Sequence, residues 1–177
     1  VNIYGPKGCG KTHLSNILKK KINLVKILNA NQINNDIISK IQKLDCLVIE
    51  NYDKNIEENL FYSTLNHLRQ LNTYVVINSE LSLKNMKFKL KDLSSRTRNF
   101  VSLGIDLPTD ELLRVIISKH FSEKQIDLGT NVSEYIIKNI ERSYEKIDKF
   151  IKEIDDLSLS SGKSININLI KKVLKNE

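Results

Sequence analysis

The sequence predicts an α/β protein, in which a P-loop core with a parallel sheet flanked by helices is followed by an all-helical lid. Three observations lead to this expectation. Short apolar segments alternate with amphipathic segments up to about residue 106, a pattern typical of parallel sheets. Residues 107–177 show apolar positions at three- and four-residue steps and no strand pattern. A glycine-rich motif after the first apolar segment matches a phosphate-binding loop.

Four apolar segments of the predicted core, residues 1–106, are expected to form strands of this sheet. The expected strands cover residues 1–4, 24–28, 45–49 and 73–77, and helices are expected at 11–21, 33–41 and 56–71. The segment 45–49 is an apolar run closed by Glu50, as expected of a central strand buried on both faces. Ligands of such sheets bind at the carboxyl ends of the strands, and we expect the site there.

The predicted lid, residues 107–177, begins with the helix-start signature Thr109-Asp110-Glu111. Apolar spacing predicts helices around 112–117, 131–141, 144–157 and 167–174, with a loop at 158–162. Because the phosphate loop begins only four residues after Val1, we expect an N-terminal part of the core to be missing from this sequence.

Residues 5–12 fit the spacing G-x-x-x-x-G-K-[ST] of a phosphate-binding loop. Glycines let the backbone curl so that its N–H groups, with the start of the next helix, face an anionic phosphate. The predicted nucleotide-binding residues of this segment are Gly5, Pro6, Lys7, Gly8, Cys9, Gly10, Lys11, Thr12 and His13. Lys11 is expected to reach the β- and γ-phosphates, and the Thr12 hydroxyl to hold Mg²⁺. We therefore predict binding of ADP or ATP with Mg²⁺.

Polar residues follow two of the predicted strands. Glu50 is the expected second anchor for Mg²⁺. Asn51 stands where a hydrolytic site needs an acid that polarises the attacking water; an amide holds a water but cannot act as its base. We therefore expect weak or no intrinsic ATP hydrolysis. Asn78 is a candidate sensor of the γ-phosphate or its water, with a turn or cap residue as the alternative.

Arg96 lies in the segment 93–98, near the expected junction of core and lid. An arginine there is a candidate finger that stabilises phosphate charge on a neighbouring subunit, and the alternative is a residue of a solvated loop. A finger would make the chain a stimulator of a partner's ATPase.

The formal net charge of +7 has two interpretations, contact with DNA or the lysine-rich composition of an AT-rich genome. Only Lys19, Lys20 and Lys21 cluster, so we expect DNA contact to be indirect or weak. No apolar run is long enough to span a bilayer and no secretory signal opens the sequence, which predicts a cytoplasmic protein without a membrane partner. The two cysteines form neither a metal nor a disulfide pattern.

Taken in order, these motifs resemble the AAA+ ATPases of the DnaA/Hda family over essentially the whole chain. The motifs are Gly-Pro-x-Gly-x-Gly-Lys-Thr-His-Leu, Leu-Val-Ile-Glu-Asn, Val-Ile-Asn-Ser and Asp-Leu-x-Ser-Arg. Asn51, and the end of the chain directly after the lid, are more similar to Hda, the regulatory inactivator of DnaA, than to DnaA itself. The resemblance implies a P-loop AAA+ fold in which Glu50 holds Mg²⁺, Asn78 or Ser79 is the first sensor and Arg96 is the arginine finger.

The resemblance also implies a function and partners. A chain of this kind contacts ATP-bound DnaA and promotes hydrolysis of its ATP, which prevents re-initiation of chromosomal replication. The DNA polymerase sliding clamp is an implied partner, although the clamp-binding peptide is not in the sequence, and a homo-oligomer is a further expectation. The second sensor position falls on Glu145, beside Lys146, so either Arg142 one turn earlier takes that role or lid sensing of phosphate is lost.

Two other functions stay open at this point. The first is a DnaA-like or helicase-loader AAA+ ATPase that binds DNA directly, which a steep salt dependence of DNA affinity would indicate. The second is a metabolic P-loop kinase, which would need substrate-binding arginines in a lid over the phosphates. The basic segment 95–98 beside the core–lid junction suits a subunit contact better.

Overall fold

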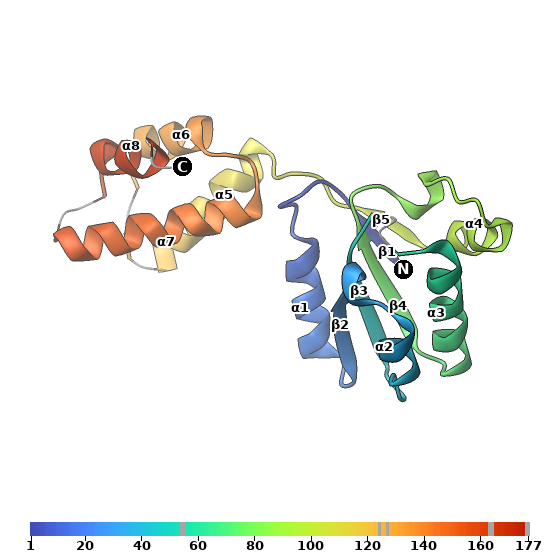
Figure 1. Ribbon diagram of the computed structural model, residues 1–177. Helices are drawn as coiled ribbons and strands as arrows, with labels where there is room; N and C mark the ends of the chain where they lie inside the picture. The colour runs from blue at the N-terminus through green and yellow to red at the C-terminus, as the bar shows by residue number, and fades with distance from the viewer. Residues whose placement is uncertain (54–55, 124, 127, 163–164, 176–177) are drawn as a thin grey trace. The chain divides into compact units, whose positions relative to one another are not determined.

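The computed structural model describes residues 1–53, 56–123, 125–126, 128–162 and 165–175. The chain divides into two compact units, Val1–Asp106 and Leu107–Glu177 (Figure 1). The first unit is a parallel sheet flanked by helices, and the second contains only helices among its described residues. The predicted fold class is confirmed.

The sheet of the first unit has five parallel strands in the order β2-β3-β4-β1-β5. The strands are β1 Asn2–Tyr4, β2 Val25–Asn29, β3 Cys46–Tyr52, β4 Tyr74–Ser79 and β5 Ser102–Gly104. Leu47, Val48 and Ile49 of β3 are fully buried, because β3 pairs on both sides and helices cover both of its faces. This confirms the predicted central strand. The sequence analysis missed β5, which is short and pairs with β1 at the edge of the sheet.

Helices of the first unit pack on opposite faces of this sheet (Figure 1). They are α1 Lys11–Lys21, α2 Asn35–Ser39, α3 Glu58–Gln70 and α4 Lys91–Arg98. Leu14 and Leu18 of α1 pack against Ile3, Val48 and Val76 on one face. On the other face, a larger core joins β3 and β4 to α2, α3 and α4. The phosphate-loop helix and α4 therefore lie on different sides of the sheet.

The second unit has its own core, built from four helices. They are α5 Asp110–Glu123, α6 Thr130–Asn139, α7 Tyr144–Ser161 and α8 Ile167–Lys175. Phe121, Ile136 and Phe150 are among the buried side chains of this core. No helix within the described part of the chain is both long and apolar enough to cross a membrane.

The loop predicted at residues 158–162 is wrong. Helix α7 continues through this serine-rich segment to Ser161, and Gly162 ends it with a φ of 60°. Leu157 packs against the core of the unit, and the hydroxyl of Ser160 donates to the Leu157 carbonyl at 3.2 Å. Hence Ser160 keeps its side-chain hydrogen bond within the helix, and the left-handed glycine sets the end of the helix.

Candidate nucleotide-binding site

The predicted phosphate loop connects β1 to α1 at the carboxyl end of the sheet. A Cβ atom on Gly5 would lie 2.0 Å from the carbonyl oxygen of Ile105, so only glycine fits there. Gly10 has a φ of 97° and precedes α1, which has no side-chain cap and no acidic residue in its first turn. The first N–H groups of a helix have no partner within the helix, so these amides are donors for an anion at the loop.

Lys11 places its ammonium group within this loop. Its Nζ donates to the carbonyl oxygens of Gly5 at 2.6 Å and Pro6 at 2.8 Å, and lies 3.6 Å from the Sγ of Cys9. The Cys9 side chain is buried. The exposed Lys7 pairs with Glu80 at 3.7 Å, a surface contact of little energetic weight. Of the two lysines in residues 5–12, Lys11 is the one whose ammonium group lies within the loop.

Four side chains from three elements form a hydrogen-bonded chain beside the loop. The Thr12 hydroxyl donates to Glu50 Oε2 at 3.1 Å, and the Asn78 amide donates to Glu50 Oε1 at 2.9 Å. The same Asn78 nitrogen donates to Ser15 Oγ at 2.8 Å, and Ser15 donates to the Lys11 carbonyl at 3.2 Å. The structure thus brings together the predicted Mg²⁺ residues and the predicted sensor, and it adds Ser15, which the sequence analysis missed.

Glu50 continues the alternation of Cys46 and Val48 toward the α1 face of the sheet, and a β-bulge follows it in β3. Ile49 pairs with Ile77 and Tyr52 with Ser79, so β3 has one more residue than β4 over this stretch. Asn51 lies in the bulge with a φ of 56°, a left-handed conformation that asparagine adopts more readily than most residues. Glu50 is only 6% exposed, whereas the Asn51 side chain is exposed to solvent.

The buried Asn78 amide has a defined orientation. Its nitrogen faces the Glu50 carboxylate, because the reversed amide would set two oxygen atoms against each other. Its Oδ1 atom is buried and has no hydrogen-bond partner. A buried acceptor without a donor costs free energy, so this oxygen fits a donor such as an ordered water.

These residues fit a magnesium nucleotide. The loop offers uncapped amides and an ammonium group to phosphates, and Thr12 with Glu50 offers oxygen ligands of the type that Mg²⁺ prefers. Among the described residues, no three His, Cys, Asp or Glu side chains gather into a metal cluster. A site with only Thr12 and Glu50 as protein ligands suits Mg²⁺, because this ion keeps several waters and takes further ligands from phosphate oxygens.

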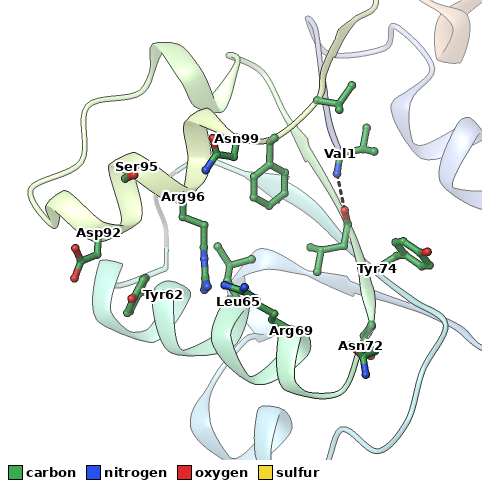
Figure 2. A pocket seen from close by; sticks show the side chains of 14 residues that line it. Val1, Tyr62, Leu65, Arg69, Asn72, Tyr74, Asp92, Ser95, Arg96 and Asn99 are labelled. Atoms are coloured by element: carbon green, nitrogen blue, oxygen red, sulfur yellow. Dashed lines mark hydrogen bonds between the residues drawn. The ribbon is translucent and has the colours of Figure 1, made fainter.

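Arg96 lies apart from this loop, on α4, where its partly buried side chain crosses to α3 of the same unit. Its Nη1 donates to Asn66 Oδ1, and its Cζ lies 5.3 Å from the centroid of the Tyr62 ring. Figure 2 shows this side chain in an open groove of about 830 Å³ between α3, α4 and the amino ends of β1 and β4. The alternative of a solvated loop is wrong, because Leu93 and Thr97 anchor α4 to the core.

The second-sensor candidates belong to the helical unit. Arg142 forms an ion pair with Asp110 through a 2.7 Å contact between Nη2 and Oδ1. Glu145 lies in the first turn of α7, and Lys146 pairs with Glu141 at 3.7 Å. The single contact with Asp110 engages one nitrogen of the half-exposed Arg142 guanidinium.

Comparison with known proteins identifies the family. The model of the RNA helicase family matches residues 1–96. This range covers the phosphate loop, strands β3 and β4 with Glu50 and Asn78, and Arg96. The chain belongs to this family.

Curated proteins similar to this chain include chromosomal replication initiators. The chain is 26% identical to the chromosomal replication initiator protein DnaA of Buchnera aphidicola subsp. Cinara cedri, over 97% of this chain and 44% of the relative. It is 25% identical to DnaA of Nitrosomonas europaea, over 98% of this chain and 42% of the relative. The chain thus spans less than half the length of these relatives.

Solved structures show the same fold. Domain III of the Thermotoga maritima replication initiation protein DnaA superposes with a TM-score of 0.79 and 20% identity, covering 99% of this chain and 83% of that one. The Thermotoga maritima RuvB Holliday junction branch migration motor gives 0.74 at 18% identity, covering 98% and 60%. DnaA bound to AMPPCP and single-stranded DNA gives 0.71 at 22% identity, covering 88% and 54%. The chain therefore has the fold of the DnaA and RuvB structures and is similar in sequence to DnaA, which confirms the coarser part of the predicted resemblance.

Proposed function

We propose that this chain is a nucleotide-binding AAA+ regulator of chromosomal replication initiation, similar to Hda. In this proposal it promotes hydrolysis of DnaA-bound ATP through Arg96 and so prevents re-initiation. The supporting observation is the separation of Arg96 from the chain's own phosphate loop. Arg96 lines a groove on the α3/α4 side of the sheet, whereas the loop opens into α1 on the other side. An arginine in that position serves a nucleotide held by another molecule.

The chain's own site binds ADP or ATP with Mg²⁺ in this proposal. Backbone amides of the loop and Lys11 hold the phosphates, Thr12 and Glu50 hold the metal, and Asn78 orients Glu50. Bound Mg²⁺ would neutralise part of the phosphate charge. Asn51 has no carboxylate to accept a proton from water, which favours weak or no intrinsic hydrolysis. The nucleotide then serves as a structural ligand of the regulator.

The effect on DnaA is electrostatic in this proposal. When ATP is hydrolysed, negative charge shifts onto the oxygens of the transferred phosphoryl group, and a guanidinium held close to them stabilises that charge. DnaA is accordingly the proposed partner in the cytoplasm, with a homo-oligomer as a second assembly. The sliding clamp is a candidate partner through the family resemblance alone.

Turnover of DnaA-bound ATP tests the role of Arg96. We expect Arg96→Ala to bind ADP like the wild type and to lose its stimulation of DnaA, measured in single-turnover assays with clamp-loaded DNA. Arg98→Ala is the matched control, because Arg98 is an exposed arginine on the same helix. Stimulation that survives in Arg96→Ala would refute the finger.

A DnaA-like ATPase that binds DNA directly is the second candidate. It draws support from the fold shared with a DnaA structure that holds single-stranded DNA, and from the net charge of +7. Direct binding predicts an affinity for DNA that falls steeply with salt, without any effect on DnaA-bound ATP. Fluorescence anisotropy with single-stranded DNA at several salt concentrations separates the two functions.

A further inference from the structure

Two side chains of one helix contact the Arg96 guanidinium. Tyr62 and Asn66 are four residues apart on α3, so their side chains project from the same face of the helix. Arg96 donates to the Asn66 amide oxygen. Its Cζ atom lies 5.3 Å from the centroid of the Tyr62 ring, and Figure 2 shows these two side chains in the groove. The hydrogen bond joins residues that are 30 positions apart in the chain.

The two contacts restrain different features of the guanidinium. The Asn66 oxygen fixes the direction of one N–H bond, and the aromatic face of Tyr62 attracts the flat cation as a whole. A guanidinium has five N–H donors, and the bond to Asn66 uses one of them. Donors in a fixed plane can therefore still face an anion, and little side-chain entropy is left to lose when the anion binds.

The groove around this cluster is suited to an anionic group. Arg69 follows Asn66 by three residues on α3 and lines the same groove as Arg96. Asp92 is the acidic residue among its lining side chains, at the first turn of α4. Two arginines thus face one open surface, and Arg96 is the one held by both an amide and a ring.

We propose that Tyr62 and Asn66 are positioning residues that fix the guanidinium of Arg96 for the phosphate of a nucleotide on a partner. The inference rests on the proposed function, since it assigns to α3 the orientation of the arginine finger. Preorganised charge stabilises a transition state more effectively than a charge that must first be ordered. The positioning residues therefore act on the rate of the partner's hydrolysis rather than on docking.

The first experiment measures the guanidinium itself in the full chain. The Arg96 side-chain Nε–Hε resonance, assigned with Arg96→Ala, should shift in Tyr62→Leu because the ring current is lost, and it should stay near its place in Tyr62→Phe. Asn66→Ala should broaden or shift the same signal. Ser63→Ala is the control, because the Ser63 hydroxyl bonds to the Leu60 carbonyl of its own helix. An Arg96 signal that is unchanged in Tyr62→Leu and Asn66→Ala would overturn the proposal.

The second experiment measures turnover of DnaA-bound ATP. Asn66→Ala and Tyr62→Leu should each lower the maximal stimulated rate by about tenfold, with the half-saturating concentration unchanged and with Tyr62→Phe close to wild type. The positioning role would be overturned if the wild type, Asn66→Ala, Tyr62→Leu and Tyr62→Phe all gave equal stimulated rates while Arg96→Ala lost stimulation. If Arg96→Ala itself keeps stimulation, the proposed function is wrong, and the resonance experiment alone decides whether α3 holds the guanidinium.

Discussion

Lys11 is the residue on which the proposed nucleotide binding depends most directly, because its ammonium group lies within the predicted phosphate loop. We expect Lys11→Ala to weaken ADP binding by about 100-fold, which corresponds to the loss of one or two charge-assisted hydrogen bonds. Isothermal titration calorimetry measures the effect. Lys19→Ala, at the other end of the same helix, should bind ADP like the wild type. An ADP affinity of Lys11→Ala equal to that of the wild type would refute the phosphate loop.

Gly5 is a second residue whose identity the structure requires. Its missing side chain makes room for the Ile105 carbonyl oxygen, which a Cβ atom would approach to 2.0 Å. Gly5→Ala should therefore lower the free energy of unfolding by about 1–3 kcal/mol, measured by urea denaturation. Gly129→Ala meets no atom within 4 Å of the added carbon, so it should change stability by less than about 1 kcal/mol. Equal stability of the two variants would contradict the close approach.

At the scale of elements, the site joins α1, β3 and β4 through Ser15 and Asn78. Ser15→Ala leaves one buried N–H group of Asn78 without its acceptor and loosens the Glu50 carboxylate. We expect the Mg²⁺-dependent gain in ADP affinity to fall by about threefold to tenfold, while ADP binding in EDTA stays unchanged. Titrations with and without Mg²⁺ measure the difference, with Ser63→Ala as the control. An equal loss with and without Mg²⁺ would mean that Ser15 only supports α1.

Element lengths and sequence spacing explain which elements were predicted. Helix α1 begins in the phosphate-loop motif, and strand β3 contains a long apolar run. Both elements were therefore predicted from the sequence, and the structure confirms them within a few residues. Helix α4 was missed because it is short and polar, with Leu93 and Thr97 as its buried residues. Strand β5 was missed because three residues give no clear period.

The residues of the candidate site also fall into those that the sequence predicts and those that it misses. The phosphate loop, Glu50 and Asn78 follow predicted strands and were therefore found from the sequence. Ser15 was missed because its partner is 63 residues away, and the contact forms only when two parallel strands and α1 pack together. The bulge at Asn51 was missed as well, since it depends on the pairing of β3 with β4.

On the scale of the whole molecule, the two units have separate hydrophobic cores, one shared by the sheet and its helices and one shared by α5 to α8. Separate cores unfold as separate cooperative units. We expect two calorimetric transitions. ADP with Mg²⁺ should raise the unfolding temperature of the transition that belongs to residues 1–106. The stabilisation should be about 2.7 kcal/mol at a ligand concentration of about 100 times Kd. A single transition that shifts as a whole would contradict independent cores.

The strand order has a consequence for how the protein is made. Strand β1 precedes β2 to β5 in the chain, yet it pairs with β4 and β5, and β4 ends at Ser79. A nascent chain on the ribosome therefore cannot complete the sheet beneath the phosphate loop, or supply the amide of Asn78, until that strand has emerged. In the proposed function, nucleotide capture accordingly waits for β4, and a message truncated before residue 79 would yield a chain with the loop motif and without the complete site.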